Sequence, residues 1–538
     1  MASAMGLQPN LIGPLRIKTP FTDGGQFSVF PAAFAALPLN PVTKHVRRMV
    51  GPRLERVTTI RRIIRCLNAW SSVGIMAFHL WEICIAAFGL GWLGICIYRA
   101  TLAPLSKLPG PWYSRFSDVI LMYNEFTAHR RVYIHELHKK FGPVVRLGPN
   151  EVSFTCLEAL REIYQSGGSG YDKTEFYNLF IQYGTRTTFS TLQKREHDQM
   201  KRYIAGSYAN TSIMHPEVVE GIQERVGAFL RQCEEAEKPA IDFYVYLHCF
   251  SMDCASFHLL HPHGTKSIEG RDLHLMREYS FGDTLKKKLL RYRLPAITRW
   301  LEKTFQQNSE SKIGHLAYKL KTSKAAFRQI QVAAECMNHL AAGIDTTGDA
   351  LCFLMHQLSL SGSHHVQDKL IAELSSNKDK SLDELPYLEA VIKEGLRCFP
   401  PIPMSQPRCV PSAGRIIDGY FIPAKTIVSC QAWSVHQLNP QIFDRGDQFL
   451  PERWLDPKAA IEMNRLFFSF SAGGRSCTGR HLAMVEMKCL LRELYSRYKT
   501  RIAPEMQGSM ELYDQAISTR PLDQTCLLTL EPLSGLKS

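Results

Sequence analysis

The chain has 538 residues, enough to bury a large hydrophobic core, and shows no internal repeat or Ser/Gly-rich linker after about residue 105. Its 15 cysteines lie mostly inside apolar runs and form no CxxC pairs, which argues against a secreted disulfide scaffold and against a zinc site. The formal net charge of +14 favours an acidic protein partner or anionic lipid, because no nucleic-acid-binding motif accompanies it. We therefore expect one large domain, residues 105–538, in a reducing environment.

An apolar segment precedes this domain. The segment Val73–Tyr98 is long enough to span a membrane. His79 and Glu82 interrupt it, so a long buried helix of the domain is the alternative interpretation. We expect a transmembrane anchor within residues 69–104, because basic residues and a rigid Leu-Pro-Gly-Pro sequence follow the apolar run.

Residues 1–68 form a basic N-terminal extension. They contain many arginines and only two acidic residues, Asp23 and Glu55, a composition typical of transit peptides. The positive-inside rule would instead place this basic side in the cytoplasm, which conflicts with a cytosolic domain behind a single span. A second membrane contact, at the apolar residues 30–39, would resolve the conflict; otherwise the extension has another role.

The remaining chain is predicted to be mostly helical. A helix is expected at Val132–Lys140, followed by short strands at Val144–Leu147 and Glu151–Phe154. Residues 196–358 have apolar side chains three and four apart, which predicts helices, and short strands return between residues 408 and 428. The fold class is therefore mainly α with small β-sheets, in a single large domain.

A polar group interrupts an otherwise apolar helical run at Ala342–Thr347. Asp345, Thr346 and Thr347 would be costly to bury there without partners or a chemical role. One interpretation is a hydroxyl that bonds back to the helix backbone. The other is proton transfer, in which a hydroxyl holds a water and a carboxyl relays protons.

The segment from Phe470 to Gly479 carries the strongest signal. Gly473 and Gly474 permit backbone conformations that a Cβ would block, and Arg475 offers a fixed fork of donors for a carboxylate. A helical run follows directly, so Cys477 is expected near a helix N-terminus, where N–H groups and the helix dipole stabilise a thiolate. The alternative is a glycine turn with an incidental cysteine.

This segment matches FxxGxRxCxG at every fixed position and so resembles the cysteine loop of the cytochrome P450 family. The stretches FGPVVRLGPNEVSF and HDQMKRYIAGSYA resemble fungal microsomal members of secondary metabolism, such as the pisatin demethylase type. The resemblance extends from Leu108 to the C-terminus. It implies the cytochrome P450 fold and a haem b whose iron has Cys477 as its axial thiolate ligand. Phe470, Gly473 and Gly479 would belong to the haem-binding loop.

Other motifs resemble the same family, in its order along the chain. The AGxDTT motif implies that Asp345 relays protons and that Thr346 holds a water beside the dioxygen. Glu394 and Arg397 form an ExxR motif, three residues apart on a helix. The later PERW motif implies that Arg453 joins them in a buried network with a structural role.

Four basic residues are expected at the haem propionates. The guanidinium of Arg475 suits a propionate carboxylate, and Arg408 matches a family position that contacts a propionate. His197 and Lys201 lie four apart on a predicted helix and face the same way, where the family commonly has Trp and Arg. They are interpreted as propionate donors, with a solvated basic surface as the alternative.

The resemblance implies a monooxygenase that inserts one oxygen atom from O2 into a hydrophobic small molecule. A separate NADPH-dependent flavoprotein reductase would supply the electrons, because the sequence shows no dinucleotide or flavin motif. The alternatives are a haem-thiolate isomerase or dehydratase without a redox partner, and a non-catalytic haem-binding protein. Asp345 and Thr346 favour the monooxygenase, because neither alternative needs protons for O2 activation.

Two surfaces and a location follow from the same resemblance. Substrate contacts are expected in residues 176–189, 341–346, 402–406 and 516–520. Basic residues expected to steer the reductase are Lys194, Arg195, Arg202, Arg480 and Lys488. The membrane is expected to be the endoplasmic reticulum, with the catalytic domain in the cytosol; a mitochondrial presequence with a ferredoxin donor is the alternative.

Overall fold

A computed structural model of the chain describes residues 54–165, 170–261, 264–280, 295–307, 316–322 and 327–533. The chain divides into two units, residues 1–88 and 89–538. The start of the basic extension, with the expected membrane contact at residues 30–39, lies outside the described residues.

Helix α1 (Leu54–Ile97) begins well before the predicted anchor and covers it as far as Ile97. The segment Leu80–Leu102 has a mean hydropathy of 1.9 and is long and apolar enough to cross a membrane. Large apolar side chains in it are exposed, including Trp81 at 66% and Phe88 at 75%. This exposure argues against the alternative of a buried core helix, because such a helix hides its apolar side chains.

The second unit is built mainly of helices, which confirms the predicted fold class. The predicted helix at residues 132–140 is α3, and it ends where Gly142 adopts a φ of 92°. The helices of this unit are α2 (Val119–Phe126), α3 (Arg130–Phe141), α4 (Leu157–Leu160), α5 (Lys194–Ile204), α6 (Asn210–Ile213), α7 (Pro216–Glu234), α8 (Phe243–Leu260), α9 (Leu273–Ser280), α11 (Pro295–Gln307), α12 (Leu316–Thr322), α13 (Gln329–Ser359), α14 (His364–Ser376), α15 (Pro386–Cys398), α16 (Ala432–Gln437), α17 (Pro457–Leu466) and α18 (Arg480–Tyr495).

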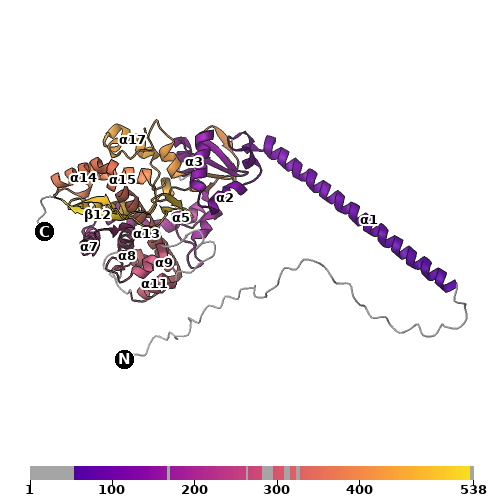
Figure 1. The fold of residues 1–538 in the computed structure, drawn as a ribbon, viewed down its shortest axis with the longest axis horizontal. Coiled ribbons are helices and arrows are strands. Elements are labelled where there is room, and N and C mark those ends of the chain that lie inside the picture. The colour runs from indigo at the N-terminus through magenta and orange to yellow at the C-terminus, as the bar shows by residue number, and fades with distance from the viewer. Residues whose placement is uncertain are drawn as a thin grey trace, which may run out of the picture. The chain divides into compact units, whose positions relative to one another are not determined.

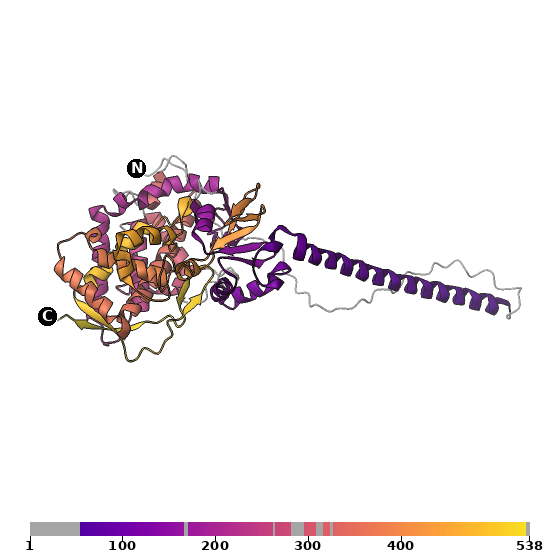
Figure 2. The same ribbon diagram turned by 90° about the horizontal axis from the view of Figure 1, so that it is seen from above.

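Short strands form small sheets beside the helices. The largest has the order β1-β2-β8-β5-β3, so the early strand β2 lies beside β8, which comes more than 270 residues later in the chain (Figure 2). The smaller sheets are β4-β12-β9, β6-β7 and β10-β11. The strands are β1 (Val144–Gly148), β2 (Glu151–Phe154), β3 (Asp172–Lys173), β4 (Ile241–Asp242), β5 (Arg408–Cys409), β6 (Arg415–Ile417), β7 (Tyr420–Ile422), β8 (Ile427–Cys430), β9 (Tyr498–Ile502), β10 (Leu512–Asp514), β11 (Thr519–Pro521) and β12 (Leu527–Pro532).

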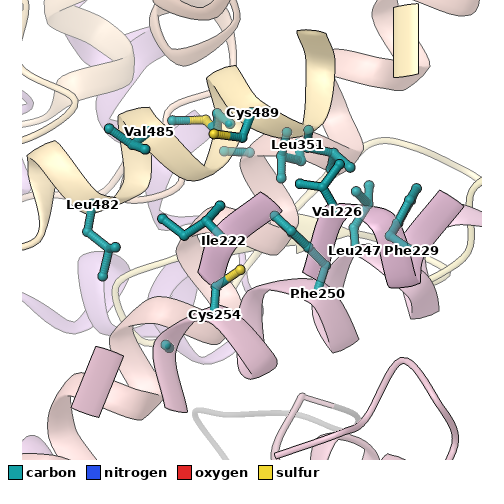
Figure 3. Packing of buried hydrophobic residues seen from close by; sticks show 14 of the residues in the cluster. Ile222, Val226, Phe229, Leu247, Phe250, Cys254, Leu351, Leu482, Val485 and Cys489 are labelled. Atoms are coloured by element: carbon teal, nitrogen blue, oxygen red, sulfur yellow. The ribbon is translucent and has the colours of Figure 1, made fainter. Parts of the chain in front are cut away.

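Helix α13 lies inside the helical body, between α8 and α15 (Figure 1). It packs closely along α8, whose side chains are buried on every face because the sequence of α8 is apolar all round. Side chains of α7, α8, α13 and α18 interdigitate there, with Ile222, Phe250, Leu351 and Val485 among them (Figure 3). This packing fixes α13, which carries the polar segment 345–347, and α18, which directly follows the cysteine loop.

Candidate active site

One cavity brings most of the predicted site residues together. Its walls come from the loop before α18, from α13, from α5 and from the segments around β3 and β5. Of the predicted residues, Cys477, Arg475, Phe470, Gly479, Thr346, Arg408 and His197 line it. Gly473, Asp345, Lys201, Glu394, Arg397 and Arg453 are not among its lining residues.

The cysteine loop presents Cys477 to this cavity. The Cys477 N–H donates to the Phe470 carbonyl at 2.8 Å and closes the loop. The thiol is exposed, yet it lies deep in the fold, because its accessible surface opens into the cavity. Burial raises the pKa of Cys477, while the Gly479 N–H and the charges of Lys201 and Arg480 act to lower it. The protein alone therefore favours the thiol, and the expected stabilisation of the thiolate only partly offsets burial.

Gly473 shapes this loop from outside the cavity. Its φ is +66°, in the left-handed region, and an added Cβ would lie 1.9 Å from the carbonyl oxygen of Tyr164. The neighbouring Gly474 has open space where its Cβ would be. The loop conformation therefore requires a glycine at position 473 but not at position 474.

Arg475 has buried donors without partners. Its Nη1 donates to the Leu192 carbonyl at 2.9 Å, but Nε and Nη2 have no hydrogen-bond acceptor in the described part of the chain. The nearest carboxylate, of Asp172, is 3.8 Å away. Burial and the charge of Arg408 lower the pKa of Arg475 to about 10. A buried guanidinium with two unused donors fits an anionic group inside the cavity.

Further basic side chains surround the same end of the cavity. Arg408 donates to the Tyr177 hydroxyl at 2.9 Å. Lys173, which the sequence analysis missed, is buried beside Arg408 and Arg475, and burial followed by these charges lowers its pKa. Lys173 had no recognisable signal, since only the fold brings β3 next to β5. Three buried cations around one space again indicate an anionic ligand.

His197 and Lys201 have different positions on α5. His197 lines the cavity, and burial together with Arg475 lowers its pKa to about 4, so it is neutral at physiological pH. Its Nδ1 lies 3.3 Å from Oδ1 of Asp198, so its one N–H donates to that carboxylate. Lys201 donates through Nζ to the carbonyls of Gly474 at 2.8 Å and Ser476 at 3.4 Å. Lys201 therefore braces the cysteine loop from behind, and only His197 of the two lies on the cavity wall.

The polar group of α13 is divided between two sides of the helix. The Thr346 hydroxyl lines the cavity and donates to the Ala342 carbonyl at 2.6 Å. Asp345 accepts a hydrogen bond from Ser280 at 3.1 Å on the other side. Burial and the neighbouring Asp349 raise the pKa of Asp345 to about 6. The helix turns by about 100° between successive residues, and here Thr346 and Thr347 line the cavity while Asp345 lies on the side away from it.

Glu486 is a buried acid on the cavity wall that the sequence analysis did not single out. Burial raises its pKa to about 8, although a hydrogen bond with Thr347 acts to lower it. The signal was present in the sequence, because Glu486 lies between the apolar Val485 and Met487 on a helix that must pack.

A buried hydrogen-bonded chain lies at another edge of the cavity and was also missed. The Tyr208 hydroxyl lies 2.7 Å from Nδ1 of His339, whose Nε2 lies 3.1 Å from Glu335. Glu335 also accepts from the Thr188 N–H at 2.9 Å. Burial acts to raise the pKa of Glu335, but these hydrogen bonds outweigh it and the pKa is lowered. Glu335 therefore accepts from Nε2–H, and Tyr208 donates to Nδ1.

The ExxR motif lies in a separate buried network. Arg397 donates to Glu394 through Nε at 2.8 Å and Nη2 at 2.9 Å, and Arg453 donates through Nε at 3.0 Å. The Trp454 indole and the Leu450 N–H also donate to Glu394. The network joins α15 to the short 3-10 helix Pro451–Leu455.

The predicted substrate segments reach the cavity at several points. Residues from them that line it are Tyr177, Thr188, Phe189, Ala342, Gly343, Thr346, Ile402, Gln406 and Ile517. Phe176 and Ala516 line a second cavity, which shares Lys173 with the first.

The comparisons with known proteins agree with this geometry. The sequence profile described as Cytochrome P450 matches residues 286–527. Cytochrome P450 monooxygenase orf2 of Aspergillus niger is 28% identical over 80% of this chain and 93% of its own length. Cytochrome P450 monooxygenase stcB of Emericella nidulans is 28% identical over 80% of this chain and 89% of its own. Cytochrome P450 monooxygenase tazI of Aspergillus terreus is 27% identical over 77% of this chain and 90% of its own length.

This family implies a haem held by a cysteine thiolate, and the cavity fits that group. Cys477 offers a thiol at the cavity surface, and the unused donors of Arg475, with Arg408 and Lys173, suit the two propionates. The predicted family and fold are thus confirmed, and the chain is a cytochrome P450 monooxygenase.

Proposed function

We propose that this enzyme inserts one oxygen atom from O2 into a hydrophobic small molecule of fungal secondary metabolism. The observation that carries the proposal is that the Cys477 thiol and the Thr346 hydroxyl line the same largely apolar cavity. When bound, haem b supplies the activation of O2 that oxygen insertion requires. Electrons come from an NADPH-dependent flavoprotein reductase.

The residues of the chain hold the cofactor. Cys477 would ligate the haem iron, and Lys201 keeps its loop in place through the Gly474 and Ser476 carbonyls. Arg475 and Arg408 would donate to the propionate oxygens, and His197 lies on the same cavity wall. Arg475 and Arg408 belong to different segments, so carboxylate binding would also tie the fold together around the cavity.

Thr346 and Asp345 move protons. The Thr346 hydroxyl gives its hydrogen to the Ala342 carbonyl, so its oxygen accepts a hydrogen bond from a water in the cavity. Asp345 takes up a proton on the Ser280 side, and a change of rotamer or a chain of waters passes that proton to the cavity. A pKa of about 6 suits this role, because the carboxyl then exchanges its proton near neutral pH.

Exposed basic side chains near the cysteine loop suit an acidic reductase. Arg195, Arg202 and Arg480 are exposed. Lys488, which was predicted with them, is not a surface charge: it is 4% exposed and pairs with Glu389 and Asp383. A buried ion pair satisfies its ammonium, so Lys488 does not take part in the proposed docking surface.

The membrane side of the catalytic unit is proposed to lie near its N-terminal helices. We place the anchor at residues 69–104 and the catalytic domain at 105–538, with the anchor in the endoplasmic reticulum and the domain in the cytosol. Large side chains exposed on and before α2, among them Trp112, Tyr123 and Phe126, support a second contact with lipid.

The absorption spectrum of the dithionite-reduced, CO-bound holoenzyme tests the haem-thiolate assignment. We expect a strongly red-shifted Soret band, lost in Cys477→Ala and kept in the control Cys489→Ala, since Cys489 is buried on α18 outside the cavity lining. A Soret band at the position of a nitrogen-ligated haem would refute the assignment. NADPH-dependent product formation with reductase then tests oxygen insertion, and turnover without NADPH would refute it.

A further inference from the structure

A second group of buried polar side chains lies behind the cavity, where α13 packs on α8. His248 of α8 and Asp349 of α13 face each other there, and Asp345 lies one helical turn before Asp349. His248 is 0% exposed and Asp349 is 3% exposed. Neither residue lines the cavity, and the proton relay described above uses neither.

The hydrogen bonds of His248 fix how it meets Asp349. Its Nδ1 lies 2.7 Å from the Tyr244 carbonyl, which only accepts, so Nδ1 carries a hydrogen. Its Nε2 lies 3.4 Å from Oδ1 of Asp349. Either the imidazolium faces a carboxylate, or a neutral imidazole faces a protonated carboxyl. In both forms the pair holds one proton, on Nε2 or on the carboxyl group, and has no net charge.

The sequence of α13 makes room for this pair. A Cβ added at Gly348 would lie 2.9–3.1 Å from three ring atoms of His248. Such contacts are shorter than normal van der Waals separations, so a larger residue would displace the imidazole. Gly348 thus leaves space for the His248 ring, and the next residue, Asp349, faces the same ring.

The pair acts electrostatically on Asp345. Burial and then Asp349 raise the pKa of Asp345, whereas His248, Ser280 and Arg520 act to lower it. For His248 burial has the opposite sign and acts to lower the pKa. The charges of Asp349 and Asp345 and the hydrogen bond to the Tyr244 carbonyl outweigh burial, so the pKa of His248 is raised.

Among the described residues, two side chains of the C-terminal part of the chain meet this group. Arg520 of β11 donates to the Ser280 carbonyl at 3.4 Å, and the Gln524 amide donates to the same carbonyl at 3.1 Å. The Tyr244 hydroxyl accepts from Gln524 at 3.0 Å. Of the described residues, Arg520 is the permanent cation that acts on Asp345, and the proton of the His248–Asp349 pair is the charge that can change.

We propose that His248 and Asp349 share a proton and act as a positioning pair that sets the pH at which Asp345 exchanges protons with the cavity. The proposal rests on the proposed relay through Asp345. While the pair holds its proton, the charge of His248 offsets only part of the effect of the Asp349 charge on Asp345. Loss of that proton leaves a carboxylate one turn from Asp345, which then keeps its own proton to higher pH.

Two substitutions with opposite signs test the pair. Asp349→Asn removes the negative charge and leaves His248 neutral, so Asp345 should lose its proton about one pH unit lower than in the wild type. His248→Asn leaves Asp349 without its cation, so one of the two carboxyls should stay protonated to a pH about one unit higher. Gly348→Ala displaces the imidazole and should shift the titration in the same direction as His248→Asn.

The measurement is infrared absorption of the carboxylic acid C=O stretch against pH, in the full-length holoenzyme. Asp345→Asn identifies the band that belongs to Asp345. Asp253→Asn is the matched control, because Asp253 is a buried acid on α8 whose partners are Thr265, Ser267 and Ile268. We expect its spectrum to keep the Asp345 titration unchanged. An Asp345 titration that neither Asp349→Asn nor His248→Asn moves would overturn the proposal.

A second readout separates this proposal from the relay itself. Hydrogen peroxide released per NADPH oxidised, with reductase present, reports failed proton delivery. If the relay holds, Asp345→Asn raises this fraction at every pH, and the two pair variants shift its pH profile in opposite directions. An unchanged fraction in Asp345→Asn would refute the relay, while the infrared titration would still decide whether the pair acts on Asp345.

Discussion

The buried network around Glu394 predicts a large loss of stability when its charge is removed. Glu394 is 0% exposed and accepts three hydrogen bonds from guanidinium groups and two from neutral N–H groups. Glu394→Gln keeps the shape but leaves two buried guanidinium groups uncompensated and turns an amide NH2 toward donors. Removing one partner of a buried ion pair costs about 3–5 kcal/mol, and the number of bonds places this change at the upper end. Urea unfolding followed by tryptophan fluorescence measures the loss.

The chain supplies a control with the same sequence spacing. Glu462 and Arg465 are also three residues apart on a helix, but their side chains are 50% and 49% exposed. Solvent screens such a pair, so Glu462→Gln should lower the free energy of unfolding by less than about 1 kcal/mol. If the two variants lost similar stability, burial would not be the cause, and the structural role of the ExxR motif would be refuted.

Comparing these two ion pairs shows how little the three-residue spacing says about burial. From the sequence, Glu394–Arg397 and Glu462–Arg465 are equivalent helical pairs. They differ only in what packs over them, since Arg453, Trp454 and the carbonyls of later loops enclose Glu394 and Arg397. The buried network was expected because PERW resembles a family motif, and the spacing alone carried no such information.

The cysteine loop was readable from the sequence because its residues are contiguous. The loop conformation depends on neighbours along the chain, as in the bond from the Cys477 N–H to the Phe470 carbonyl. Lys173 and His248 were not readable, because their partners lie on elements far away in the sequence. Lys488 was misjudged for the same reason: a lysine on a helix usually faces solvent, and its burial depends on Asp383 and Glu389.

Helical geometry also limits what a motif can say. The sequence placed Asp345 and Thr346 together as a relay, but adjacent residues on a helix point in different directions. The structure puts Thr346 on the cavity and Asp345 against Ser280. The polar residues of α13 were therefore predicted from the sequence, whereas the side of the helix on which each one lies, and Ser280 as the partner of Asp345, were not.

Three further predictions follow from the cavity. Gly473→Ala should lose haem and its Soret absorption, because its Cβ would collide with the Tyr164 carbonyl, whereas Gly474→Ala has room and should keep both. Thr346→Ala should raise hydrogen peroxide release and lower the amount of product formed per NADPH oxidised. Thr346→Ser keeps the hydroxyl and should restore the wild-type amount of product per NADPH. An unchanged amount in Thr346→Ala would contradict the proposed water site. Glu486 has a pKa raised to about 8, against 4.5 unfolded, so between these values the native state holds a proton that the unfolded chain has lost. This contribution to the free energy of unfolding is complete at low pH and is lost as the pH rises from about 4.5 to about 8. Glu486→Gln should therefore flatten the decline in unfolding free energy over that range, as measured by urea unfolding at a series of pH values. An unchanged slope would show that Glu486 is ionised in the folded protein.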